Sequence, residues 1–210
     1  MIFTKKDQTT LNKIIASRRD VRGNNFINKK ISQKKLTKIL NSAQNAPSVG
    51  YSQPWRFVIV DKKNKNLVYD HFKKSYDKSK KKFKDNKLYN SLKLEGIIES
   101  DVNIAVYYEK SKTDILGQTY MKRTGEYSVV CAILNMWLTA RALNIGMGWV
   151  SILKPKKINK IFDIKKEDYK FIAYLCFGYT KEFLDEPELK KLGWKKKKKM
   201  KNLILKRKKI

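Results

Sequence analysis

Three arginines and one aspartate lie within five residues near the start of the chain, in the stretch Arg18-Arg19-Asp20-Val21-Arg22. An arginine guanidinium binds phosphate through a planar fork of donors and remains charged at any working pH. Because the chain otherwise takes its positive charge mainly from lysine, this stretch predicts a binding site for a phosphorylated ligand. A solvated basic turn is the alternative that the stretch alone leaves open.

A second candidate stretch, residues 46–55, is dense in small residues and turn formers and leads into an expected strand at 56–60. Ser48 and Gly50 would let the backbone approach a flat ring closely, and nearby hydroxyl and amide groups could bond the polar edge of that ring. A plain connector between a helix and a strand is the alternative for this stretch. A third candidate is the hydroxyl of Ser151, near the end of an expected buried strand.

The composition indicates a single domain spanning residues 1–210. The chain is 41% hydrophobic, and its formal net charge is +30. Because the lysines are spread along the whole chain without a recognition helix or zinc-finger spacing, we attribute the charge to compositional bias and expect no nucleic-acid partner. No apolar run approaches transmembrane length, so we expect a cytoplasmic protein without a membrane partner. Cys131 and Cys176 lack metal-ligand spacing, which predicts reduced thiols and no bound metal.

The pattern of apolar residues predicts an α+β fold in which helices flank a central mixed sheet. The expected strands are 56–60, 102–108, 146–152 and 171–177. Two segments are expected outside this core. Residues 62–98 are helical, rich in lysine and weakly amphipathic, which is typical of a lid insertion. Residues 195–210 form a basic C-terminal extension.

Four helices are expected to build the layers around the sheet. Thr9 or Thr10 would cap the first helix, whose inner face would carry Leu11, Ile14 and Ile15. Ser32 would cap the second, and Pro155 would start a short helix ending at Phe162. The helix that Thr124 would cap is apolar nearly all round, so we expect it to be buried centrally or across a subunit interface.

Taken together, these stretches resemble the flavin-dependent nitroreductase superfamily. The resemblance runs in order along nearly the whole chain. It is carried by residues 18–22, 46–50, 53–55, 91–96, 116–119, 127–132, 148–152, 187–189 and 193–194. Asp20, the Ser48-Val49-Gly50 loop and the Trp149-Val150-Ser151 strand favour the members that break FMN down. Ordinary NAD(P)H-dependent FMN reductases and nitroreductases of the same fold are the alternative.

The resemblance implies an intertwined homodimer with two flavin sites at its interface. Reduced FMN would be both ligand and substrate, and molecular oxygen the co-substrate. The products would be erythrose 4-phosphate and 5,6-dimethylbenzimidazole, the lower ligand of vitamin B12. A separate flavin reductase would supply the reduced FMN.

The resemblance also assigns roles to individual residues. Arg18, Arg19 and Arg22 would hold the phosphate and ribityl chain, Ser48 and Gly50 would lie along the isoalloxazine, and Leu92 would close over it. The full set of implied FMN contacts is Arg18, Arg19, Asp20, Val21, Arg22, Ser48, Gly50, Leu92, Trp149, Val150, Ser151 and Lys195. Lys195 stands where the family usually has an arginine, and lysine offers no bidentate fork to phosphate.

Asp20 and Ser151 match the two polar residues that the family uses for fragmentation. Breaking a carbon–carbon bond of the ribityl chain is a retro-aldol-like step, and a carboxylate beside it can move the required proton. Neighbouring arginines would lower the pKa of Asp20 and burial would raise it, so the sequence leaves its value open. As alternatives, Asp20 could serve only to order the arginines, and Ser151 could bond only the backbone.

Overall fold

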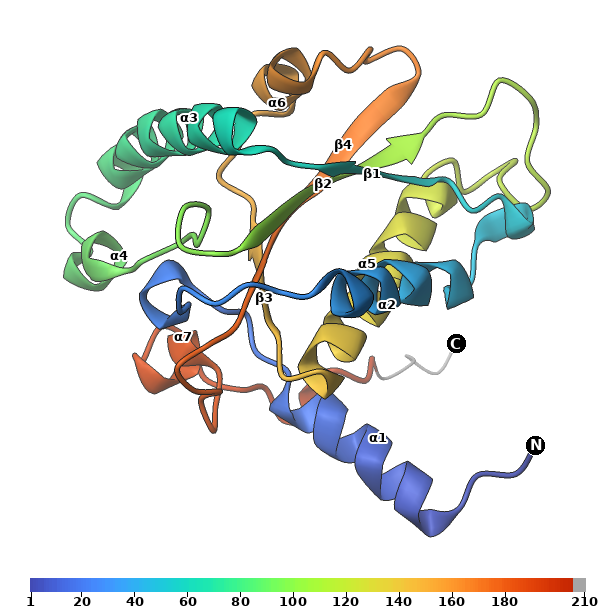
Figure 1. Ribbon diagram of the computed structural model, residues 1–210, viewed down its shortest axis with the longest axis horizontal. Helices are drawn as coiled ribbons and strands as arrows, with labels where there is room; N and C mark the ends of the chain where they lie inside the picture. Colours follow the sequence, from blue (N-terminus) through green and yellow to red (C-terminus); the bar gives the residue numbers. More distant parts are fainter. Residues whose placement is uncertain (206–210) are drawn as a thin grey trace.

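A four-stranded antiparallel sheet forms the centre of the computed structural model, which describes residues 1–205 (Figure 1). Its strands are β1 (Trp55–Ile59), β2 (Val102–Glu109), β3 (Gly146–Val150) and β4 (Tyr169–Gly178), in the order β1-β2-β4-β3. The four predicted strands are therefore confirmed. Parallel pairing within the described chain is confined to an isolated bridge between Asp20 and Met147, at the β3 edge.

One face of the sheet is covered by α5 (Thr124–Ala142), with α2 (Gln33–Ser42) packed against it. Buried side chains of α5 at helical spacing, including Val129, Ile133 and Met136, contact the sheet in one core. Tyr127, Val130 and Leu134 lie on another side of α5 and are about half exposed. The sequence predicted that this helix lies centrally or in a subunit interface. It is central, and residues 1–205 leave one of its apolar faces about half exposed.

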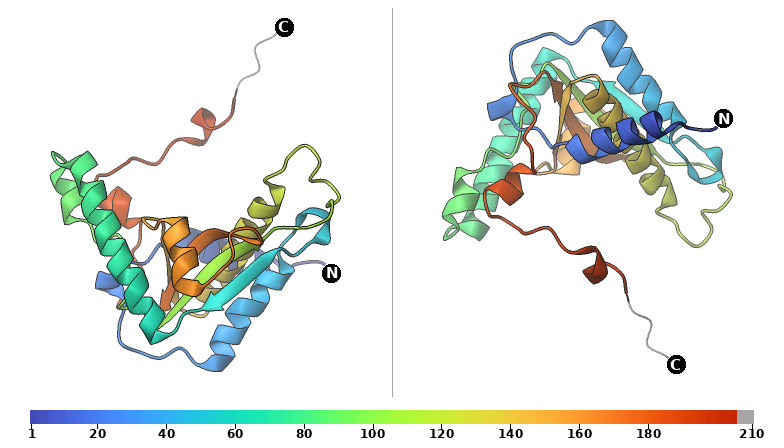
Figure 2. Two further views of the ribbon diagram at one scale, coloured as in Figure 1. Left: turned by 90° about the horizontal axis from the view of Figure 1, so that it is seen from above. Right: turned by 90° about the horizontal axis from the view of Figure 1, so that it is seen from below.

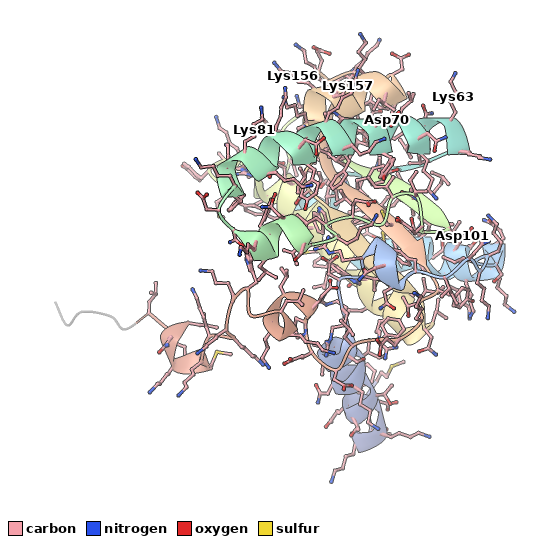
Figure 3. All side chains as sticks on the ribbon, turned by 90° about the vertical axis from the view of Figure 1, so that its left-hand side faces the viewer. Lys63, Asp70, Lys81, Asp101, Lys156 and Lys157 are labelled. Carbon is pink, nitrogen blue, oxygen red and sulfur yellow. The ribbon has the colours of Figure 1, made fainter. Side chains whose placement is uncertain are left out.

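The opposite face is covered by α3 (Lys62–Lys80) and α6 (Pro155–Phe162). Val68 and Phe72 of α3 are buried in this second core, so residues 62–80 act as a sheet-covering helix. The segment that can serve as a lid is therefore shorter than 62–98, and contains the one-turn 3-10 helix η4 (Lys81–Phe83) and α4 (Lys87–Ser91). Lysines such as Lys63 and Lys156 line the outer side of this layer (Figure 3).

The N-terminal helix α1 (Lys5–Ser17) differs from the prediction in two ways. Thr4 caps it, because Asp7 lies three residues on and completes a capping box, whereas the Thr9 and Thr10 hydroxyls donate to carbonyls within the helix. Leu11 and Ile15 were expected to face inward and are about half exposed, so that prediction is wrong for the single chain. The helix extends away from the sheet (Figure 1). Its exposed Leu11 and Ile15 side chains form an apolar surface.

The remaining helices are short. They are the 3-10 helices η1 (Gly23–Asn25), η2 (Ala43–Asn45), η3 (Val49–Tyr51) and η5 (Met200–Asn202), and α7 (Glu188–Lys191). Ser32 caps α2 as predicted, and Pro155 begins α6, but Arg123 occupies the N-cap position expected for Thr124. Residues 195–205 project away from the body (Figure 2), and 206–210 of the predicted extension lie outside the described residues. Within residues 1–205, no helix is long and apolar enough to cross a membrane.

Candidate active site

Residues 18–22, called here the Arg cradle, leave α1 in extended conformation and lie against the edge of β3. The Val21 N–H donates to the Met147 carbonyl over 3.0 Å, next to the Asp20–Met147 bridge. Gly148 permits this close approach, since a Cβ at that position would lie 2.3 Å from the Val21 carbonyl oxygen. The arginine-rich stretch is therefore an added edge segment of the sheet, held in register with β3.

The Asp20 carboxylate is fixed at both of its oxygens. Oδ1 accepts the Trp149 N–H over 2.9 Å, and Oδ2 forms an ion pair with Arg22. The side chain retains 30% exposure, so a ligand can reach it. Burial raises the pKa of Asp20, against the lowering effects of Arg22, the Trp149 N–H and Arg18. A carboxylate with a raised pKa is a better proton acceptor than an ordinary aspartate.

The three guanidinium groups of the Arg cradle have different partners. Arg22 bonds Asp20 and the Leu94 carbonyl, the latter over 3.0 Å. Arg19 donates to four carbonyls, from residues 16, 18, 184 and 185, and so has a structural task.

The guanidinium of Arg18 makes no hydrogen bond within residues 1–205, so its donors are available to a ligand. It lies over the Trp137 ring, 4.5 Å from the centroid. Burial lowers the pKa of Arg18, while Asp20 acts in the opposite sense. Of the three arginines, Arg18 is therefore best placed to donate hydrogen bonds to a phosphate.

The segment that follows α4 lies directly beside the Arg cradle. Its Leu94 carbonyl accepts from Arg22, and its Glu95 carbonyl accepts the Gly23 N–H over 2.7 Å. Leu92 is buried, and its carbonyl accepts the Tyr76 hydroxyl over 3.0 Å. Leu92 therefore lies two residues from the Leu94 carbonyl that contacts Arg22, and its role over the flavin stays a prediction.

The loop containing Ser48 and Gly50 lies elsewhere. The Val49 N–H donates to the Ser128 hydroxyl over 3.1 Å, near the start of α5, whereas Trp137 Nε1 donates to the Arg19 carbonyl further along. These two α5 residues are nine positions apart, or about 14 Å along the helix axis. Within one chain, the loop and the Arg cradle therefore contact α5 at separate points along its length.

The β3 residues divide between core and surface. Trp149 is partly buried and holds Asp20 through its N–H, whereas the Val150 side chain is buried in the core and cannot face a ligand. Ser151 is exposed just past the strand, two residues beyond Trp149 and so about 7 Å along the chain. Lys195 is exposed, and follows Trp194 in the C-terminal extension.

Two residues that position the site were missed at the level of sequence. Trp137 supports Arg18 with its ring and Arg19 with its N–H, yet in the sequence it is one more apolar residue of a core helix. Ser128 holds the Ser48–Gly50 loop. A buried serine in a helix this apolar was the available signal, because such a hydroxyl requires a partner.

Comparison with known proteins assigns this arrangement to a class. The family model described as the nitroreductase family matches residues 15–179, and the chain belongs to that family. The chain is 38% identical over 199 residues to the 5,6-dimethylbenzimidazole synthase of Rhodospirillum rubrum, covering 92% of each protein. It is 31% identical to the enzyme of the same name from Rhodobacter capsulatus, covering 92% of this chain and 95% of that one.

Solved structures support the same fold. A BluB-like flavoprotein from Clostridium difficile superimposes with a TM-score of 0.69 at 20% identity, over 94% of this chain and 99% of that one. A putative nitroreductase from Desulfovibrio desulfuricans, solved in complex with FMN, gives 0.68 at 18% identity, over 95% and 98%. The family resemblance and the predicted nitroreductase-like α+β fold are confirmed. The four described strands pair antiparallel, so the mixed pairing expected of the sheet is confined to the isolated Asp20–Met147 bridge, and the homodimer stays a prediction.

Proposed function

We propose that this protein catalyses the oxygen-dependent breakdown of reduced FMN to 5,6-dimethylbenzimidazole. The similarity to curated synthases extends over 92% of the chain, which includes the Arg cradle, the Ser48–Gly50 loop and Ser151. The single structural observation that carries the proposal is the placement of Asp20. Its carboxylate is anchored between Trp149 and Arg22, partly exposed, and has a raised pKa.

The residues present fit FMN. The guanidinium of Arg18 donates no hydrogen bond within the described chain and is partly buried, so a phosphate could take up donors that residues 1–205 leave unused. Arg22 would help to hold the ribityl chain, and Arg19 would shape the cradle through the backbone. As the substrate, FMN would supply the dimethylated ring of the product and the electrons that reduce oxygen.

Asp20 is the proposed base. A retro-aldol-like cleavage of the ribityl chain requires removal of a hydroxyl proton, and the raised pKa makes Asp20 a stronger proton acceptor than an ordinary aspartate. The Trp149 N–H and Arg22 orient the carboxylate and stabilise its charge. Ser151, about 7 Å further along the backbone, is proposed to hydrogen-bond the substrate ring at its edge.

The proposed active enzyme is a homodimer, because one chain separates the two parts of the predicted site along α5. The exposed face of α5 (Tyr127, Val130 and Leu134) offers an apolar surface for a second copy. If two α5 helices pack antiparallel about a two-fold axis, the partner's Ser48–Gly50 loop meets this chain's Arg cradle. The same axis generates two equivalent sites at the interface.

Two further roles complete the proposal. Residues 81–94 are proposed to close over the ligand as a lid, since their C-terminal end already contacts the Arg cradle. Each turnover consumes one FMN, so a separate flavin reductase is proposed to supply the reduced form. Both roles rest on the proposed reaction.

The reaction is tested directly by its product. Purified protein is mixed with chemically reduced FMN, exposed to air and analysed by mass spectrometry, with a protein-free sample as control. We expect 5,6-dimethylbenzimidazole to appear as FMN is lost. Complete recovery of intact FMN would contradict the proposal and favour the ordinary NAD(P)H-dependent reductase, for which the 26% identical putative nitroreductase of Bacillus subtilis is a model.

A further inference from the structure

Residues 184–194, called here the C-terminal strap, connect the Arg cradle to the tip of the lid. At the cradle end, Arg19 Nε donates to the Leu184 carbonyl over 2.8 Å, and Arg19 Nη2 donates to the Asp185 backbone carbonyl. The cavity left between the cradle and residues 182–188 is only about 20 Å³, room for about one water molecule. The strap therefore lies closely on the cradle at this end.

At its other end, the C-terminal strap meets an aromatic pair on the lid. Phe83 and Tyr89 stack with their ring centroids 4.2 Å apart. The Trp194 ring lies 6.3 Å from Phe83 and 6.1 Å from Tyr89, within the range of aromatic contacts. The turn that presents Trp194 is made by Gly193 at φ +77° and is closed by the Trp194 N–H donating to the Leu189 carbonyl.

On the side of the C-terminal strap, the lid tip is only partly covered. Phe83 is 39% exposed even with Trp194 in place, and the lysines around it face solvent. On the body side, Tyr76 donates its hydroxyl to the Tyr89 and Leu92 carbonyls, which ties the lid to α3. Figure 2 shows the chain leaving α7 beside the α3–α4 end before it projects outward. Trp194 thus joins the C-terminal strap to the lid through Phe83 and Tyr89.

We propose that Trp194 is a positioning residue, through which the C-terminal strap couples the lid to the Arg cradle. Arg19 fixes one end of the strap, and Trp194 fixes the lid tip at the other. Lys195 is the next residue and is exposed, and its contact with the FMN phosphate is part of the proposed function. The consequence for ligand retention rests on the proposed function, whereas the coupling itself is a property of the protein without ligand.

Hydrogen exchange measured by mass spectrometry on the unliganded full chain tests the coupling. In Trp194→Ala, exchange in peptides covering residues 79–92 should accelerate about threefold to tenfold, the loss expected for one or two aromatic contacts. Trp194→Phe should restore most of the protection, and Met200→Ala, beyond the strap, should leave it unchanged. Peptides covering 110–122 serve as an internal reference. Lid exchange in Trp194→Ala within a factor of two of wild type would overturn the proposal.

A double-mutant comparison separates lid contact from general destabilisation. Phe83→Ala should accelerate lid exchange on its own, and adding Trp194→Ala should accelerate it little further, because the contact is already lost. Fully multiplicative effects would contradict a direct Phe83–Trp194 coupling.

A second assay tests whether the coupling slows the release of FMN. Release of FMN from the pre-formed complex, followed by flavin fluorescence, should be several-fold faster in both Trp194→Ala and Lys195→Ala, but only Trp194→Ala should change lid exchange in the free protein. Unchanged release in both variants would overturn the role in ligand retention. Failure of the wild type to bind FMN would refute the proposed function. The coupling between the strap and the lid would still be tested by hydrogen exchange on the unliganded protein.

Discussion

The two points at which α5 meets the predicted site are built differently. At the Arg cradle, Trp137 and Arg141 donate to backbone carbonyls of residues 19 and 17, and the Trp149 N–H fixes Asp20. At the Ser48–Gly50 loop, one hydroxyl of α5 holds the loop, and the neighbouring Tyr51, Leu116 and Tyr120 are strongly exposed. The Arg cradle is held by hydrogen bonds within the chain, whereas the side chains around the loop are exposed to solvent. In the proposed dimer, the reacting groups are held within one chain, and the partner subunit supplies the wall that binds the ring.

The largest expected effect lies in the cradle. Asp20→Asn preserves the shape of the side chain but cannot accept the proton, so product formation should fall about 10²–10⁴-fold. FMN affinity should change only a few-fold, because the amide can still accept the Trp149 N–H. Single-turnover product yield and FMN binding by fluorescence quenching check the two halves of this prediction. A parallel loss of binding and product would show that Asp20 merely orders the arginines.

The next effect tests whether the loop end needs a partner. Leu134→Glu places a charge on the uncovered face of α5, where association would bury it, and should dissociate the dimer and weaken FMN binding about a hundredfold or more. Leu67→Glu, on α3, is a matched control because the two leucines are 48% and 44% exposed. Analytical ultracentrifugation and FMN titration provide the readouts. A Leu134→Glu protein that is monomeric and binds FMN normally would exclude a site shared between chains.

A smaller effect distinguishes the arginines within the cradle. Arg18→Ala should weaken FMN about tenfold to a hundredfold, the range for a hydrogen bond to a charged group, and should leave riboflavin affinity unchanged because riboflavin lacks phosphate. Arg19→Ala should instead lower the free energy of unfolding by about 1–3 kcal/mol, since it leaves carbonyls such as that of Leu184 without their donor. Titration with both flavins and denaturant unfolding separate these outcomes. Equal sensitivity of FMN and riboflavin to Arg18→Ala would contradict the phosphate assignment.

The smallest effect concerns pH. Because burial raises the pKa of Asp20, the carboxylate should become protonated at a higher pH than an ordinary aspartate. The rate of product formation should therefore decline as pH falls through this raised pKa, approaching about tenfold per pH unit below it. The pH profile of single turnovers, beside that of FMN binding, measures the effect. A rate that stays constant down to pH 4 would contradict Asp20 as the base.

Local features of the site were predictable because they depend on residues close in sequence. The cluster of Arg18, Asp20 and Arg22 identified the cradle, and Ser32 correctly placed the start of α2. Features set by packing between distant residues could not be predicted from the sequence. Leu11 and Ile15 lie on an apolar face, but periodicity cannot say what covers it, and in the single chain nothing within residues 1–205 buries them. Residues 62–80 were assigned to the lid because they are rich in lysine, yet Val68 and Phe72 of α3 are buried in the core against the sheet.

The arrangement of the motifs was the least accessible feature. Ser48, Gly50 and the Arg cradle were assigned to one site on the strength of a resemblance, and each was found in the expected local structure. Their separation along α5 follows from tertiary contacts of Ser128 and Trp137, which no local pattern encodes. The sequence identified both stretches and, through the resemblance, a homodimer. That one site takes its cradle and its loop from different copies of the chain is proposed from their separation along α5.

Complementation between inactive variants tests this shared site most directly. Asp20→Asn removes the base from the cradle. Gly50→Val should distort the loop, because Gly50 has φ +54° and an added Cβ would lie 2.7 Å from Ile115 Cγ2. The two variants, carrying different tags, are produced separately and together. If each site takes its cradle from one chain and its loop from the other, a mixed dimer has one intact site, and random pairing should restore about a quarter of wild-type product formation. Product formation by the mixture no greater than that of the separate variants would contradict a site built from two chains.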